Sequence, residues 1–167
     1  GSTFPLGTNS VTCVATDSSA NTASCGFNVV VLITMTANAS VNLAIPDGTP
    51  VGLVSTLKVS TPIGRISGLK VNLNIAGGYN GDLYAYLVHD SGFAILLNRA
   101  GRTLANPFGY GDAGFNVTLD DQAANGDIHI YRRKPPGNDN IPLGGPLTGS
   151  WVADGRNTDP ATVTEFV

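Results

Sequence analysis

Short segments in which apolar and polar residues alternate recur along this chain, and they constrain its fold more than any other feature. The clearest runs from Ile66 to Ile75, where Leu69, Val71, Leu73 and Ile75 occupy every second position. Successive side chains of a strand point to opposite faces, so this alternation predicts a half-buried antiparallel strand. The 21 glycines and 10 prolines divide the chain into turn-bounded pieces. The pattern therefore predicts an all-β fold.

From about Met35 onward, the sequence predicts a series of such strands. We expect strands at residues 41–45, 53–59, 66–75, 82–88, 93–97 and 115–119. The run Gly77-Gly78-Tyr79-Asn80-Gly81 is expected to form a tight reversal, and Ser91-Gly92 the next turn. The stretches 98–114 and 132–160 are rich in Gly, Pro and Asn, which predicts long loops.

Two cysteines lie on either side of a run of turn-forming residues, Asp17-Ser18-Ser19-Ala20-Asn21. The flanking segments 11–16 and 25–31 are rich in β-branched residues, which predicts a hairpin. Pairing about Ser19 places Cys13 opposite Cys25, and a disulfide there would contribute about 3 kcal/mol in an oxidising compartment. The alternative is two free thiols in a cytosolic protein. The spacing of the cysteines fits no metal or redox motif.

The same segment resembles the end of a hyalin-repeat (HYR) module, an immunoglobulin-like extracellular domain. The resemblance is carried by Pro5-Leu6-Gly7-Thr8, by residues 11–17 (Val-Thr-Cys-Val-Ala-Thr-Asp) and by Asn21-Thr22-Ala23-Ser24-Cys25. It implies that residues 1–34 supply the last two strands of such a module. It also implies a secreted or cell-surface protein.

Residues 36–160 resemble the P domain that follows the catalytic domain of subtilisin/kexin-like proteases. The matching motifs, in chain order, are Ile45-Pro46-Asp47-Gly48, Tyr79-Asn80-Gly81-Asp82-Leu83, residues 87–92 (Leu-Val-His-Asp-Ser-Gly) and residues 116–121 (Asn-Val-Thr-Leu-Asp-Asp). The resemblance implies that residues 35–167 form a jelly-roll-like β-sandwich. That family ends with two Trp-bearing strands, whereas this chain has only Trp151. We assign residues 149–154 to the preceding loop and expect the last two strands to be missing.

The charge of the chain excludes some classes of partner. A net charge of -3 and a pI near 5.1 argue against nucleic-acid binding. The basic cluster Arg132-Arg133-Lys134 is followed by two prolines, so we interpret it as a solvated loop. The longest apolar run, residues 29–33, is far shorter than the roughly 20 residues that span a bilayer.

The sequence predicts no catalytic constellation. His89 and His129 are the only candidate histidine bases, and neither a Gly-x-Ser-x-Gly nor a His-Glu-x-x-His motif is present. His89 precedes a predicted β-turn. His129 alternates with Ile128 and Ile130, which favours a surface or edge-strand position.

Calcium is the cofactor that we expect. Asp47, Asp82, Asp120 and Asp121 each lie at a predicted turn or strand end, and carboxylate oxygens are ligands that Ca²⁺ prefers. P domains are often calcium-stabilised, and the resemblance implies these four aspartates as ligands. The alternative is that Asp47 and Asp82 cap turns through their own backbone.

These features together predict a non-catalytic, calcium-stabilised accessory or interaction module of a secreted or cell-surface multidomain protein. One alternative is the P domain of a secreted subtilisin-like serine endopeptidase; another is a subunit that exchanges strands with a copy of itself. The expected partners are neighbouring domains or a strand-donating copy. A carbohydrate-binding module is a further class, which exposed aromatic residues would mark: Tyr79, Tyr84, Tyr86 and Tyr110. Tyr84 and Tyr86 share a face of their predicted strand, and the alternative is that both belong to the core.

Overall fold

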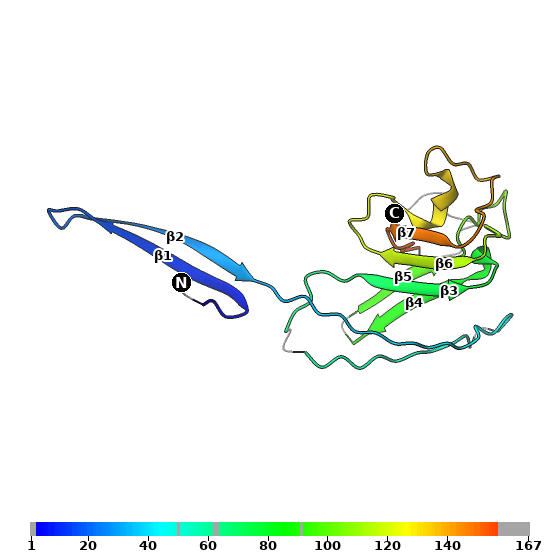
Figure 1. Ribbon diagram of the computed structural model, residues 1–167, viewed down its shortest axis with the longest axis horizontal. Helices are drawn as coiled ribbons and strands as arrows, with labels where there is room; N and C mark the ends of the chain where they lie inside the picture. Colours follow the sequence, from blue (N-terminus) through cyan, green and yellow to red (C-terminus); the bar gives the residue numbers. More distant parts are fainter. Residues whose placement is uncertain (1–2, 50, 62–63, 91, 157–167) are drawn as a thin grey trace. The chain divides into compact units, whose positions relative to one another are not determined.

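The computed structural model describes residues 3–49, 51–61, 64–90 and 92–156 of the chain. The chain divides into two compact units, Gly1–Ile66 and Ser67–Val167. Figure 1 shows the strands of both units. Strands are the main regular secondary structure of the described residues, and helix is confined to two short 3₁₀ segments. The all-β class is therefore confirmed. In the described part of the chain, no helix is both long enough and apolar enough to cross a membrane.

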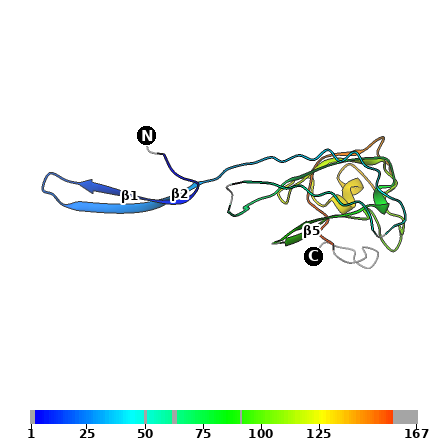
Figure 2. The same ribbon diagram turned by 90° about the horizontal axis from the view of Figure 1, so that it is seen from below.

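The first unit begins with the predicted hairpin. Strand β1 (Gly7–Thr16) pairs antiparallel with β2 (Thr22–Val31), and both views show a long two-stranded ribbon (Figures 1 and 2). The Asp17 carboxylate accepts hydrogen bonds from the backbone N–H groups of Ser19 (2.8 Å) and Asn21 (2.9 Å). Ala20 adopts a left-handed conformation with φ of 65°. This is the geometry of a three-residue hairpin loop closed by a bulge.

The strands expected at residues 41–45 and 53–59 are wrong. Among the described residues, no strand is formed between the end of β2 and Val71. Val41, Leu43 and Ile45 alternate as expected, yet their side chains are 36%, 62% and 46% exposed. Alternation specifies which face of a strand would be buried, but a strand also needs a neighbour to bind its backbone groups. The described residues supply no such neighbour here.

The second unit holds a three-stranded sheet and a two-stranded sheet. In the first, the order is β3 (Val71–Ala76), β6 (Gly114–Leu119) and β7 (Leu147–Trp151). Strand β3 runs antiparallel to β6, and β7 runs parallel to it. The second sheet pairs β4 (Tyr84–His89) with β5 (Gly92–Asn98) (Figure 1). Four predicted strands are thus confirmed, although β3 begins at Val71 rather than Ile66.

Two assignments in the C-terminal part are wrong. Residues 149–151, assigned to a loop, end strand β7, and Trp151 is only 4% exposed. Residues 128–130 do not form a strand but open the 3₁₀ segment η2 (Ile128–Arg133). Asp127 caps this segment, because its carboxylate accepts a hydrogen bond from His129 N–H at 2.8 Å. An aspartate at this position favours a helical turn over a strand.

The core of the second unit gathers around Tyr131 of η2. Its ring makes edge contacts with three other aromatic rings, those of Tyr110, Phe115 and Trp151, at centroid distances of 4.8, 6.3 and 6.3 Å. Aromatic pairs in such geometry contribute about 0.5–1.5 kcal/mol beyond the burial of their area. Phe115, Val117 and Leu119 supply the inward face of β6. Figure 2 shows η2 from below, in yellow.

Strand β4 turns its aromatic residues outward. Ala85 and Leu87 pack against the core, whereas Tyr84 and Tyr86 are 50% and 53% exposed. Tyr86 also contacts Phe93 of β5, with ring centroids 5.3 Å apart. Of the two alternatives for these tyrosines, core or surface, the structure shows the surface position.

Candidate functional site

A buried polar network begins at the first 3₁₀ segment, η1 (Asn80–Asp82), and ends at η2. The Asn80 side chain is fully buried and holds Gly114 from both sides: its amide donates to Gly114 O at 3.1 Å, and its oxygen accepts from Gly114 N–H at 2.7 Å. The same amide donates to the Tyr131 hydroxyl at 3.1 Å. That hydroxyl in turn donates to Asp112 at 2.5 Å. The network ties the loop before β6 to η2.

Asp112 is the acceptor on which this network converges. Its carboxylate accepts a two-pronged interaction from Arg132, with Nε at 2.7 Å and Nη2 at 2.9 Å, and it accepts Leu143 N–H at 2.7 Å. Burial works to raise the pKa of Asp112, but hydrogen bonds from Arg132 and Tyr131 outweigh it and lower that pKa below its ordinary value. Burial, reinforced by Asp112, raises the pKa of Tyr131. Asp112 is therefore a charged, fully paired carboxylate.

A second network holds the last described residues against β5. His129 Nδ1 lies 2.8 Å from Asp154, and its Nε2 lies 3.1 Å from the Arg102 carbonyl oxygen. Arg156 binds Asp154 at 2.9 Å and Asp127 at 2.7 Å. Asp154 also accepts the backbone N–H of Asn98 at 3.1 Å. These contacts fix residues 154–156 to the core.

The two histidines have different surroundings. His129 is 3% exposed, so the expected surface or edge-strand position is wrong. Both of its ring nitrogens face acceptors, and the ring is a structural tie between η2 and residue 154. His89 ends β4 and is exposed, as the predicted turn implies.

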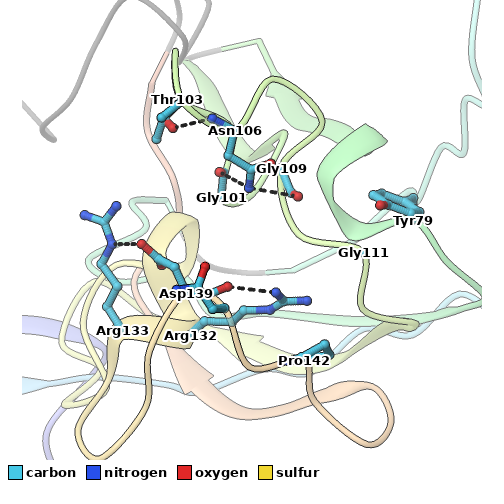
Figure 3. A pocket seen from close by; sticks show the side chains of 12 residues that line it. Tyr79, Gly101, Thr103, Asn106, Gly109, Gly111, Arg132, Arg133, Asp139 and Pro142 are labelled. Atoms are coloured by element: carbon cyan, nitrogen blue, oxygen red, sulfur yellow. Dashed lines mark hydrogen bonds and ion pairs between the residues drawn. The ribbon is translucent and has the colours of Figure 1, made fainter.

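A polar pocket of about 660 Å³ opens beside the first network. Figure 3 shows the loop residues Thr103, Asn106 and Gly109 on one side, and Arg132, Arg133 and Asp139 on the other, with Tyr79 apart from both. All of these residues belong to the second unit. The volume of the pocket falls in the range of small-molecule sites, and its lining is more polar than is usual for them. It is the candidate functional site of the chain.

Hydrogen bonds to backbone fix the loop side of the pocket. The Asn106 amide donates to the carbonyl oxygens of Gly101 (3.1 Å) and Gly109 (3.0 Å), which closes residues 101–109 on themselves (Figure 3). Gly109 has φ of 69°, and a Cβ there would lie 2.5 Å from the carbonyl oxygen of Ala100. Only glycine fits this position without moving backbone. The loop wall is therefore preorganised.

Paired charges form the opposite wall. Arg133 Nε lies 2.7 Å from Asp139, Arg132 Nη1 donates to the Asp139 carbonyl oxygen at 2.9 Å, and the Tyr110 hydroxyl donates to the Asp139 carboxylate. Burial acts to raise the pKa of Asp139, but hydrogen bonds from Tyr110 and Arg133 lower it overall. Burial also raises the pKa of Tyr110, so its hydroxyl remains a donor. The interpretation of Arg132-Arg133-Lys134 as a solvated loop is wrong for Arg132, whose side chain is 9% exposed.

The four aspartates predicted to bind calcium are divided between the two units. Asp82 and Asp121 are exposed, and Asp47 lies in an exposed turn of the first unit. Asp120 binds Lys70 at 2.7 Å and accepts the backbone N–H of Gln122 at 3.1 Å, which lowers the pKa of Asp120. Across the described ranges, no three Asp, Glu, His or Cys side chains are grouped as a metal site requires. Calcium binding stays a prediction.

The two cysteines occupy the predicted register. Cys13 lies directly opposite Cys25 in the β1–β2 ladder, and both are exposed free thiols in this structure. Directly opposed residues of an antiparallel pair have Cα atoms about 4.5 or 5.5 Å apart, and disulfides form at about 4.4–6.8 Å. The hairpin backbone therefore needs no rearrangement to accept the bond. The disulfide itself stays a prediction.

The sequence pattern did not single out the residues of the pocket wall or of the buried network behind it. Arg132 and Asp139 of the wall and Asp112 of the network lie in stretches interpreted only as loops, and the P-domain motif drew attention to Asp82 rather than to Asn80. One signal was available: Asp127, followed by apolar residues at Ile128 and Tyr131, is the pattern of a capped 3₁₀ turn with one buried face.

Residues 1–31 match the family model of the HYR domain. The match covers the β1–β2 hairpin and ends at the last residue of β2. HYR domains occur in extracellular proteins, so this part of the chain indicates a module of an extracellular multidomain protein. Neither a curated protein nor a solved structure matches the chain.

Proposed function

We propose that this chain is a non-catalytic binding module of an extracellular multidomain protein, and that the polar pocket of the second unit is its ligand site. The observation that carries the proposal is the HYR match over residues 1–31, joined in one chain to a unit with a preformed pocket. The opposed cysteines of the hairpin support it, because their geometry suits an oxidising compartment.

Secretion of the chain tests this proposal. The chain is directed into an oxidising secretory pathway, recovered from the medium and digested without reduction, and its peptides are mapped by mass spectrometry. We expect a linked Cys13–Cys25 peptide, and a Cys13→Ser control that lacks it. A secreted, folded chain whose two thiols are both labelled by an alkylating reagent would contradict the extracellular assignment.

The non-catalytic part of the proposal has its own test. Incubation of the purified chain with peptide, ester and glycoside substrates should yield no products above a heat-denatured control. Turnover that disappears on substitution of a pocket residue would show that the module is an enzyme.

A finer version of the proposal makes residues 35–167 a P-domain-like accessory domain, stabilised by calcium. The order of the motifs at residues 45–48, 79–83, 87–92 and 116–121 supports it. The decisive observation is the neighbouring sequence in the full-length protein. A subtilisin-like catalytic domain upstream would favour the protease role, and further HYR-like repeats would favour a surface or adhesive protein.

A further inference from the structure

The pocket beside Asp139 brings together charged groups that cancel one another. Arg132 pairs with Asp112 and Arg133 pairs with Asp139, at 2.7 Å in both cases. The two guanidinium groups of this wall are balanced by one carboxylate in the wall, Asp139, and by one buried behind it, Asp112. A pocket for phosphate or sulfate would offer unpaired cations, and a cation site would offer unpaired carboxylates. The balance favours an uncharged ligand.

The carboxylate of Asp139 still has room to accept. One oxygen takes the Tyr110 hydroxyl and the other takes Arg133 Nε, while each carboxylate oxygen has two lone-pair positions. The side chain is 39% exposed and lines the pocket. Hydrogen bonds to an ionised acceptor are about twice as strong as neutral ones. A neutral ligand can donate to this carboxylate through its hydroxyl groups, and the net charge of the pocket then stays the same.

Tyr79 adds an apolar surface to this polar cavity. It is 48% exposed, and its ring rests against the backbone at Gly111, where a Cβ would come within 2.8 Å of the ring. An aromatic ring at the edge of a cavity whose lining is otherwise mainly polar suits a ligand with one apolar face and a rim of hydroxyls. A sugar ring has that form, because its axial C–H groups lie on its faces and its hydroxyls on its edge.

We propose that this pocket binds a neutral carbohydrate, with the sugar ring against Tyr79 and its hydroxyls donating to Asp139. The inference rests on the proposed function, since it names the ligand class of the same site. Preorganisation of the loop wall by Asn106 and Gly109 lowers the entropy lost on binding.

An array of neutral oligosaccharides ending in glucose, galactose, mannose or N-acetylglucosamine is the first probe, with heparin as the anionic arm. The strongest neutral binder is then titrated calorimetrically into the chain. We expect saturable binding that varies little between roughly 0.05 and 0.5 M salt, because no net charge is neutralised. Binding to heparin alone, or to no glycan by a folded chain, would overturn the proposal.

Variants locate the site. Tyr79→Ala and Asp139→Asn should each weaken binding by roughly tenfold or more. Tyr84→Ala is the matched control, since Tyr84 is equally exposed (50%) but lies on β4 and not among the lining residues. Thermal melts confirm that each variant is folded. Equal loss in Tyr84→Ala, or unchanged affinity in folded Tyr79→Ala, would place the sugar elsewhere and reject this site.

The outcomes separate this inference from the proposed function. A secreted chain with a closed disulfide that binds no neutral glycan would leave the extracellular module standing and remove only the sugar. Cleavage of the bound oligosaccharide would instead retain the sugar site and remove the non-catalytic role.

Discussion

Asp112 holds η2, the loop at Leu143 and the loop before β6 together, because Arg132, Leu143 N–H and Tyr131 all donate to its carboxylate. Its pKa is lowered in the folded chain, whereas in the unfolded chain it returns to about 3.9. The stability from this carboxylate is therefore fully present above about pH 4 and is lost as the pH falls through the folded value.

We expect thermal melts between about pH 7 and pH 2 to show a midpoint that falls below about pH 4. Asp112→Asn should be less stable at neutral pH by about 3 kcal/mol, because it leaves Arg132 unpaired, and its melting temperature should depend less on pH. The more exposed Asp139→Asn serves as the comparison. A wild-type midpoint that is flat from about pH 5 to about pH 2 would contradict the assigned role.

Asn80 and Asp82 lie in the same sequence motif, but Asn80 is buried and Asp82 is exposed, so substitutions distinguish a structural role from a surface role. Asn80→Ala removes the amide that holds Gly114 and Tyr131, and it should cost about 1–3 kcal/mol because it strands buried partners. The exposed Asp82→Ala, two residues away, should stay within about 0.5 kcal/mol in calcium-free buffer. Urea unfolding followed by tryptophan fluorescence at Trp151 measures both. Equal losses of unfolding free energy in the two variants would show that Asp82 also stabilises the fold.

Charged residues of this kind escaped the sequence analysis for a physical reason. Arg132 and Asp112 are 20 residues apart in the sequence, and His129 and Asp154 are 25 residues apart. Nothing in the linear pattern indicates that either pair is in contact. A charge in a Gly- and Pro-rich stretch is normally solvated, so each was interpreted by itself. Their burial depends on the fold that brings both members together.

At the scale of strands, local patterns succeeded in two ways. The hairpin β1–β2 follows from its turn residues and β-branched flanks, although both of its strands are largely exposed, and alternation marks β3, β4 and β6, each of which turns one face to the core. Alternation failed for β7, whose sequence Leu-Thr-Gly-Ser-Trp buries only its two ends and whose residues pair with residues of β6 that lie 32 positions earlier in the chain. It failed again at residues 41–45, where alternation occurs without a partner strand.

Calcium binding by the aspartates at turns and strand ends is tested by thermal melts. If Asp82, Asp120 and Asp121 supply ligands, then Ca²⁺ should raise the melting temperature and EDTA should lower it. A hundredfold excess over Kd corresponds to about 2.7 kcal/mol. Asp121→Ala should abolish the shift, while Asp17→Ala, in the hairpin turn, should preserve it. An identical melt in Ca²⁺ and in EDTA, with no metal by elemental analysis, would exclude the site.

On the scale of the whole chain, apolar side chains remain at the surface of both units. Tyr86 and Phe93 form an exposed contact on the second unit, and Phe27 and Val30 are 52% and 58% exposed on the hairpin. A two-stranded hairpin is at best marginally stable alone in water, and strand edges can pair with other chains. These features support the expectation that strands are supplied by a neighbouring domain or by another copy.

Size-exclusion chromatography with light scattering distinguishes these sources. Donation between copies predicts a mass that grows with protein concentration in an open head-to-tail series. Completion by a neighbouring domain predicts that an extended chain, with that domain present, is monomeric and melts higher. A soluble monomer of the present chain with a single cooperative melt would contradict both, and would show that its sheets are complete.

The parallel pairing of β6 with β7 has a consequence for how the protein is made. Asp154, which anchors the last described residues, follows Leu119 by 35 residues. At the usual ~5–20 residues per second of translation, this interval lasts roughly 2–7 seconds. During it, Phe115, Val117 and Leu119 have already been synthesised, while Asp154 and the residues of β7 that join them in the core, Leu147 and Trp151, have not all been made. A nascent chain at this stage is a natural substrate for chaperones, and codon-dependent pauses between residues 119 and 154 would lengthen its exposure.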